Sequence, residues 1–275
     1  MKHDSRYHSI QASLKKLLAA VPFPCAVHAE LLSGEDPCVI YSQNANLVFG
    51  AASVIKLPLL VCVEELIETG ALAWDQPVVL TVPAPHGTGL LEFLDCSRPW
   101  TIRDLSVLMM GTSDNMACNQ LLEVVGMARA NEILRVLGYT ATVVRRRMMD
   151  REKLALGVDN TVTALETADM LSRLHAGRLI SAEASAETLK YLRMNQLRDL
   201  TAWPLPGSVV LAGKTGGMPG SLLDAELISI PGGSTYSLCV FTSGFERALQ
   251  AKRLISEISE QLYAAVSGSG GEGCD

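Results

Sequence analysis

The strand patterns of this chain lie near its two ends and are separated by a long run of helix patterns. Short apolar, β-branched runs occur at Cys25–Leu32 and Cys38–Tyr41, and again at Val209–Gly217, Leu223–Ile230 and Thr235–Thr242. Strands left unpaired in either group would expose their backbone edges. We therefore expect one antiparallel sheet that takes strands from both ends of the chain.

Helix patterns fill the ends and the middle of the chain. Apolar residues recur at helical spacing in His8–Ala20, Thr101–Met110 and Glu246–Val266, and Thr101 with Asp104 forms a capping-box pattern. The expected fold class is α/β (α+β), with an antiparallel sheet flanked by terminal helices and an inserted all-helical domain. The expected division is residues 1–52 together with 200–266 for the discontinuous sheet domain, 53–199 for the helical insert and 267–275 for a disordered Gly/Ser-rich tail.

The charge of the chain argues against several kinds of partner. With 275 residues, a net charge of −6 and no basic run, we expect neither nucleic acid nor a membrane as a partner. The apolar run Leu57–Val63 is too short to span a bilayer, and the polar segment Met1–Ser13 lacks the apolar core of a signal peptide. The sequence as it stands therefore predicts a cytoplasmic protein, or a periplasmic or secreted one if a signal was removed.

Cysteine and histidine spacing gives no sign of a metal site. The seven cysteines include no Cys-x-x-Cys pair, which favours free thiols in a reducing compartment over a set of disulfides. The five histidines form no ligand-spaced cluster with cysteines or carboxylates. We expect no metal and no other cofactor, and a monomer or a small homo-oligomer.

The stretch Gly50–Lys56 joins a polar turn to a long apolar helix pattern. Ser53 and Lys56 are three residues apart, so on a helix they share one face. One interpretation is structural, with Ser53 as a helix N-cap and Lys56 as a surface residue. The other is chemical, because a lysine with a lowered pKa can take the proton of a nearby serine.

Two further motifs follow in order, Ser113-Asp114-Asn115 between two helix patterns and Lys214-Thr215-Gly216 at the end of a predicted strand. Ser-x-x-Lys, Ser-Asp-Asn and Lys-Thr-Gly together are the signature of class A β-lactamases and penicillin-binding proteins. From about Leu14 to Tyr263, the chain resembles the serine β-lactamase and DD-peptidase superfamily, closest to class A. The resemblance implies the β-lactamase/transpeptidase-like fold.

The resemblance implies roles for the residues that act in attack on a carbonyl group. Ser53 would be the nucleophile that forms an acyl-enzyme, and Lys56 would accept or relay its proton. A neighbouring Lys214 would disfavour the charged form of Lys56. Ser113 would pass a proton to the leaving nitrogen, and Asn115 would orient Lys56 or bind the amide of the substrate. Asp114 is expected to be structural.

The third motif would bind the substrate. Lys214 and Thr215 would form a positive, hydroxyl-bearing edge for a carboxylate, with Gly216 and Gly217 beside it. The resemblance implies an oxyanion hole made by the backbone N–H groups of Ser53 and Gly217. Losing one such donor typically costs a factor of about 10²–10³ in rate.

The loop after the helical block departs from the family pattern. Class A enzymes have an Arg-x-Glu-x-x-Leu-Asn sequence there, whose glutamate activates the water that releases the acyl group, and Arg145–Asn160 does not match it. Asp150 and Glu152 are the candidates for a substitute base, or they form ion pairs on the loop. One arginine of this loop is expected to pair with Asp150 or Asp159. Glu166 is expected to interact with the first turn of the next helix.

The strand after Lys214 departs from expectation too, since it has Asp224 and Glu226 and no obvious arginine to help hold a carboxylate. If these acids lie next to the site, they would disfavour an anionic substrate or favour one with an amine.

The leading functional hypothesis is a serine hydrolase that acts on a β-lactam or a related small amide or ester. The alternatives are a cytoplasmic acyltransferase or amide-forming biosynthetic enzyme, and a penicillin-binding or sensor domain that is acylated without turnover.

Overall fold

The central feature of the fold is one five-stranded antiparallel sheet built from both ends of the chain. The computed structural model describes residues 7–32 and 36–268. The strand order is β2-β1-β9-β8-β7, and the pairing of β1 with β9 joins the N-terminal strands to the C-terminal ones, as expected. The strands are β1 (Cys25–Leu31), β2 (Cys38–Gln43), β7 (Val210–Met218), β8 (Ser221–Ser229) and β9 (Thr235–Ser243).

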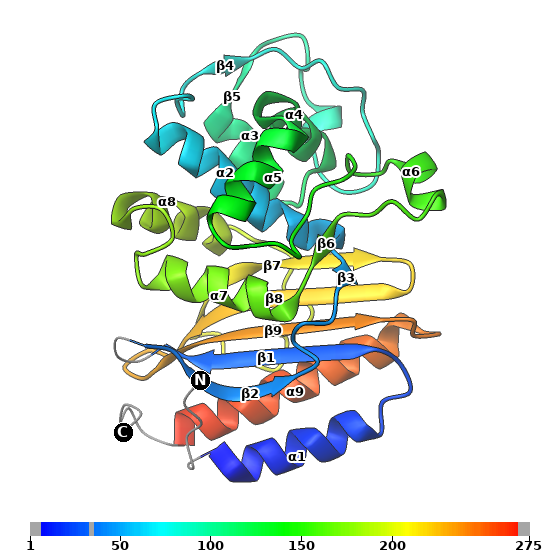
Figure 1. Ribbon diagram of the computed structural model, residues 1–275, viewed down its shortest axis with the longest axis vertical. Coiled ribbons are helices and arrows are strands. Elements are labelled where there is room, and N and C mark those ends of the chain that lie inside the picture. The colour runs from blue at the N-terminus through cyan, green and yellow to red at the C-terminus, as the bar shows by residue number, and fades with distance from the viewer. Residues whose placement is uncertain (1–6, 33–35, 269–275) are drawn as a thin grey trace.

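Helices cover both faces of this sheet, which confirms the α/β class with terminal helices beside an antiparallel sheet (Figure 1). The terminal helices α1 and α9 lie together on one face, and α7 and α8 contact the other face. The helices are α1 (His8–Ala19), α2 (Lys56–Glu68), α3 (Ile102–Gly111), α4 (Asn115–Val125), α5 (Met127–Val136), α6 (Arg151–Ala155), α7 (Ala164–His175), α8 (Ala182–Arg193) and α9 (Ala248–Gly268).

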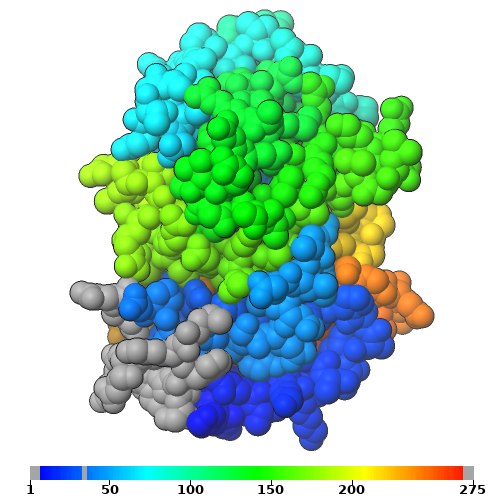
Figure 2. All heavy atoms as spheres, viewed as in Figure 1, coloured from blue at the N-terminus to red at the C-terminus, as the bar shows by residue number. Residues whose placement is uncertain are grey.

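Short elements connect the helical block to the sheet. Strand β3 (Phe49–Gly50) pairs with β6 (Thr161–Val162), and β4 (Pro77–Val78) pairs with β5 (Trp100–Thr101). In the space-filling view, the light-blue segment that contains β3 lies directly against the green segment that contains β6 (Figure 2). The 3₁₀ turns are η2 (Ala52–Ile55) and η3 (Leu91–Phe93). The β3–β6 pair therefore holds η2 next to the sheet. The division of the chain at residues 53 and 199 stays a prediction.

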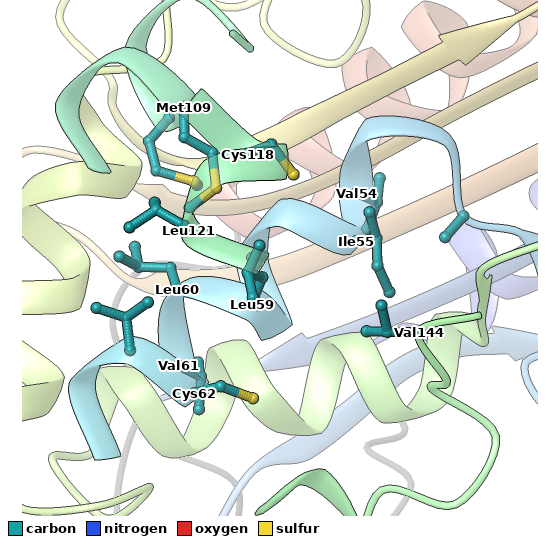
Figure 3. Packing of buried hydrophobic residues seen from close by; sticks show 14 of the residues in the cluster. Val54, Ile55, Leu59, Leu60, Val61, Cys62, Met109, Cys118, Leu121 and Val144 are labelled. Atoms are coloured by element: carbon teal, nitrogen blue, oxygen red, sulfur yellow. The ribbon is translucent and has the colours of Figure 1, made fainter. Parts of the chain in front are cut away.

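Two apolar cores lie on the two faces of the sheet. One packs α1 and α9 against the sheet, and the other joins the sheet to the helical block around α2. Figure 3 shows the centre of the second core, where Leu59 and Leu60 of α2 lie near Met109 and Leu121. Nearly every residue of α2 from Lys56 to Leu66 is buried. A helix apolar on all sides fits this position, because other elements surround it.

Several local predictions need correction. The strand that carries Lys214 continues to Met218, so Lys214 lies in its interior rather than at its end. Helix α9 runs to Gly268, so Ser267 and Gly268 of the predicted disordered tail are helical, and residues 269–275 lie outside the described residues. Cys25, Cys62, Cys96, Cys118 and Cys239 are free thiols, whereas Cys38 is disulfide-bonded. The expectation of free thiols is therefore wrong for Cys38.

The part of the chain that the structure describes contains neither a membrane-spanning helix nor a cluster of metal ligands. There, no helix is long and apolar enough to cross a membrane. Among the same residues, no group of three or more histidine, cysteine, aspartate or glutamate side chains is arranged to hold a metal ion.

Candidate active site

Ser53 and Lys56 lie at the junction of η2 and α2. The backbone N–H of Ala51 donates to Asn160 O at 2.7 Å, and Ala52 has a φ of 43°. A left-handed non-glycine residue is strained and is found often at functional sites. Ser53 lies inside the 3₁₀ turn and Lys56 begins the α-helix, with no side-chain cap at either start. The interpretation of Ser53 as a helix N-cap is therefore wrong.

The Lys56 ammonium position is fully buried and surrounded by oxygen atoms. Its Nζ lies 3.1 Å from Ser53 Oγ, 3.0 Å from Ser113 Oγ, 2.6 Å from Ser113 O and 2.9 Å from Asn115 Oδ1. Burial lowers the pKa of Lys56 to about 8, although Cys118 and Asp114 act in the opposite direction. A neutral amine is therefore accessible near neutral pH.

The backbone of Ser113 directs two oxygens at Lys56. Ser113 has a φ of 56°, and both its carbonyl oxygen and its hydroxyl lie within hydrogen-bond distance of Lys56 Nζ. The Thr88 hydroxyl also donates to Ser113 O at 2.7 Å, and the Asn115 N–H donates to Thr88 O at 3.0 Å. Thr88 is a site residue that sequence reasoning missed, because its loop carries no motif.

Asp114 has a structural place, as expected. Its carboxylate accepts from Ala117 N at 2.9 Å, which caps α4. It also accepts from the N–H groups of Leu90 and Leu91 at 2.6 and 2.7 Å. These bonds fasten the loop before η3 to the start of α4. They also keep Thr88 next to Ser113.

Strand β7 lies close to η2 and brings the third motif to the site. A Cβ added to Gly216 would lie 3.1 Å from Ser53 N and 3.0 Å from Val54 N, so only glycine permits this approach. Lys214 is fully buried and donates to Thr215 O at 2.8 Å. Burial, with the nearby charge of Lys56, lowers the pKa of Lys214 to about 7.

A cleft of about 540 Å³ opens in front of these residues. This volume is within the range of small-molecule sites. Of the predicted site residues, the cleft is lined by Ser53, Ser113, Asn115, Thr215, Gly217 and Asp150. Lys56, Lys214 and Gly216 are outside this lining, and Lys56 contacts three of the lining residues, Ser53, Ser113 and Asn115.

The two candidate bases on the loop are placed differently. Asp150 lines the cleft and its side chain accepts from Lys153 N at 3.0 Å, so it caps α6. Glu152 is exposed on the first turn of α6 and does not line the cleft. The structure therefore brings Asp150, but not Glu152, to the cleft that contains Ser53.

The loop is held by the predicted ion pair and by an asparagine that sequence reasoning missed. Arg146 pairs with Asp159 at 2.7 Å, and Glu166 accepts from the N–H groups of residues 140–142. Asn119 bonds to both the N–H and the C=O of Met148, which lines the cleft. Read from Arg146, the family pattern Arg-x-Glu places its glutamate at Met148. This alignment is the signal that could have identified Met148.

The acids of β8 lie next to Lys214 and Thr215, as expected, but they do not line the cleft. Asp224 and Glu226 are each 2% exposed and are absent from the cleft lining. In the β7–β8 register they are the partners of Thr215 and Gly213, so their side chains are covered by neighbouring residues. Asp224 accepts from Thr201 N at 2.9 Å, and its other oxygen lies 2.9 Å from Thr215 Oγ1.

Solved structures resemble the whole chain in fold. No curated protein sequence matches the chain. PBP-A superposes with a TM-score of 0.85 at 21% identity over 95% of this chain and 97% of that one. A β-lactamase from Sphaerobacter thermophilus DSM 20745 superposes with a TM-score of 0.81 at 25% identity, over 93% and 97%. An ancestral class A β-lactamase (GNCA) gives 0.80 at 22% identity, over 93% and 99%.

These matches confirm the β-lactamase/transpeptidase-like fold that the three motifs predicted. The family model described as "Beta-lactamase enzyme family" matches residues 9–266, which is nearly the whole chain. The resemblance read from the sequence is therefore confirmed at the level of the family. The protein belongs to the β-lactamase enzyme family.

Proposed function

We propose that this protein is a serine hydrolase that forms an acyl-enzyme on Ser53 with a β-lactam or a related small amide or ester. The observation that carries the proposal is the position of the buried Lys56 Nζ, 3.1 Å from Ser53 Oγ and 3.0 Å from Ser113 Oγ. A base within hydrogen-bond reach of a serine hydroxyl is the geometry that activates this nucleophile.

The attack step uses Lys56 as the base. A neutral Lys56 has two N–H hydrogens, which match the two oxygens that can only accept, Ser113 O and Asn115 Oδ1. Its lone pair is then available for the proton of Ser53 Oγ. The oxygen attacks the substrate carbonyl carbon, and the N–H groups of Ser53 and Gly217 stabilise the oxyanion.

The leaving group departs with a proton supplied through Ser113. Its hydroxyl lies between Lys56 Nζ and the cleft, so a proton taken up by Lys56 can be passed to the leaving nitrogen or oxygen. This returns Lys56 to its neutral form and leaves Ser53 esterified. Water then has to hydrolyse the ester to regenerate the enzyme.

The release step is expected to be slow with water. Met148 stands where the family pattern has its water-activating glutamate, and the lining carboxylates are Asp150, which caps α6, and Asp199, which is paired with Lys252. This favours a second candidate function, acyl transfer to an amine or alcohol acceptor. A release rate that is unchanged by added amines and alcohols would eliminate this second function.

Time-resolved mass spectrometry of the intact protein tests the proposal. With a chromogenic β-lactam, we expect a rapid burst, a mass increase on Ser53 and slow decay of the adduct. Ser53→Ala should lose the burst and the adduct, while Ser97→Ala, an exposed serine outside the cleft, should keep both. If neither a β-lactam nor an activated ester leaves an adduct on Ser53, the proposal is wrong. More than one turnover per site would eliminate the alternative of a sensor domain that is acylated without turnover.

A further inference from the structure

The cleft in front of Ser53 has a largely apolar wall. It is formed by Met148, Met149, Leu154, Leu197, Leu200, Met218, Pro219 and Leu222. Met149 and Leu154 are each 36% exposed and Leu197 is 40% exposed, although such side chains gain free energy when removed from water. We call these three residues the apolar rim. They come from the loop, from α6 and from the segment after α8, and they meet at one cleft.

Lys214 and Thr215, which were expected to hold a carboxylate of the substrate, form hydrogen bonds within the protein instead. Lys214 is fully buried, does not line the cleft and donates to Thr215 O. Thr215 Oγ1 lies 2.9 Å from Leu197 O and 2.9 Å from Asp224 Oδ1. A threonine hydroxyl has one hydrogen, so both contacts are satisfied when Thr215 donates to Leu197 O and a protonated Asp224 donates to Thr215.

The buried position of Asp224 agrees with this arrangement, because burial raises the pKa of its carboxyl group. In either hydrogen-bond arrangement, the hydroxyl hydrogen of Thr215 points to a protein acceptor and not into the cleft. Of the motif that would bind a carboxylate in this family, Lys214 therefore does not line the cleft and Thr215 directs its hydroxyl hydrogen to a protein acceptor.

Two of the three cationic side chains that line the cleft are paired with carboxylates. Arg146 is paired with Asp159 at 2.7 Å, and Lys252 is paired with Asp199. Arg151 is the third lining cation, exposed on α6 next to the apolar rim. It is therefore the residue through which an anionic substrate would have to be recognised, and the experiment below includes it.

We propose that the substrate carries an extended apolar acyl chain and no carboxylate, and that the chain lies against the apolar rim. This rests on the acyl-enzyme function proposed above. The acyl part is assigned to this wall because the wall lines the same cleft as Ser53, whose Oγ bonds to the acyl carbon. Ser53 Oγ bonds to the acyl carbon, the bond to the leaving alcohol or amine breaks, and the leaving group takes the serine proton.

Esters of p-nitrophenol test the proposal, because the leaving group stays constant while the acyl chain grows. We expect kcat/KM to rise from the acetate through the butyrate and hexanoate to the octanoate, by up to about fourfold per added methylene. The mono-p-nitrophenyl ester of adipic acid matches the hexanoate in length and ends in a carboxylate. It should react at least about tenfold more slowly than the hexanoate.

Two leucines two residues apart give a matched pair of variants. Leu154→Ser, in the apolar rim, should flatten the rise from acetate to octanoate about three- to tenfold. Leu156→Ser removes a leucine that is 80% exposed and outside the cleft lining, so the whole series should stay as in the wild type. Circular dichroism spectra and melting curves check that both variants fold.

The outcomes separate this inference from the proposed function. If the acetate acylates Ser53 but the rate does not depend on chain length, the inference fails alone. If an adipate ester reacts faster than the hexanoate and loses that advantage in Arg151→Gln, the cleft selects anions and the inference is overturned. If no ester leaves an adduct on Ser53, the proposed function itself fails.

Discussion

Lys56 Nζ has four oxygen atoms within 3.1 Å, one more than an ammonium group can satisfy with its three hydrogens. Two of these oxygens belong to hydroxyl groups, which can donate as well as accept. The set therefore also suits a neutral amine that accepts one hydroxyl hydrogen. At the scale of the residue, catalysis depends on which of these two forms is present.

The pH dependence of acylation follows from the pKa of Lys56. Burial lowers it to about 8, so the fraction of neutral base rises as the pH increases through that value. We expect the burst rate with a β-lactam to increase about tenfold per pH unit below pH ~7.5 and to level off above pH ~9. Stopped-flow measurements from pH 6 to 10 check this. A rate that falls or stays constant over this range would exclude Lys56 as the base.

A glutamate at position 148 should speed the release step. Met148 is 8% exposed, lines the cleft and is held at both backbone groups by Asn119, so Met148→Glu places a carboxylate there without moving the loop. We expect the lifetime of the Ser53 adduct to shorten about 10–100-fold. Mass spectrometry measures the lifetime. Met148→Gln, which has a similar shape and no base, should keep the long-lived adduct, and equal lifetimes in both variants would contradict the prediction.

At the scale of the element, the approach of β7 to η2 sets the site. A methyl group at Gly216 would lie 3.0–3.1 Å from Val54 N and Ser53 N, so Gly216→Ala should push β7, with its Gly217 N–H, away from the Ser53 N–H. Acylation should slow about 10–1000-fold, as when one such donor is lost. Burst kinetics measure it. Gly207→Ala, where an added Cβ meets nothing within 4 Å, should react like the wild type.

Features whose interacting residues lie close together in the sequence were predicted correctly. Helix α3 begins after Thr101 with the capping box of Thr101 and Asp104, because that signal lies within four residues of sequence. An ion pair from one arginine of the loop around α6 to Asp150 or Asp159 was expected, and Arg146 pairs with Asp159. In each case the partners are near in sequence, so few arrangements compete.

Features set by distant contacts could not be predicted from the sequence. The left-handed backbone of Ser113 depends on Thr88 and Lys56, which approach it from other elements. The direction of Asp224 depends on the register between β7 and β8, and a shift of one residue would turn it to the opposite face. For this reason the sequence could indicate that Asp224 and Glu226 lie beside the site, but not that both are buried and absent from the cleft lining.

At the scale of the whole molecule, pairing of β1 with β9 makes the two ends of the chain one unit. This part of the fold followed from the sequence because each strand group alone would leave edges unpaired. Helix α2 then passes through the middle of the helical block. Because α2 is surrounded by other elements, we expect the ionisation of a buried carboxyl group in α2 to change the free energy of unfolding of the whole molecule.

Glu64 carries this carboxyl group. It is 2% exposed, and its Oε1 has no hydrogen-bond partner in the described part of the chain. Burial, together with the charge of Glu187, raises the pKa of Glu64 to about 8. Between the unfolded pKa of about 4.5 and the folded value, the folded state binds more protons than the unfolded state, so stability falls as the pH rises.

Glu64→Gln should remove this loss, because glutamine stays neutral at every pH. The free energy of unfolding should match that of the wild type near pH 4 and exceed it by roughly 4 kcal/mol at pH 8, at about 1.4 kcal/mol per pKa unit. Urea denaturation at several pH values measures the difference. Glu132→Gln, at an exposed position on α5 whose charge is not among the causes of the raised pKa of Glu64, serves as the control and should leave the pH dependence unchanged. If the two variants show the same pH dependence, Glu64 is ionised in the folded protein and the prediction is wrong.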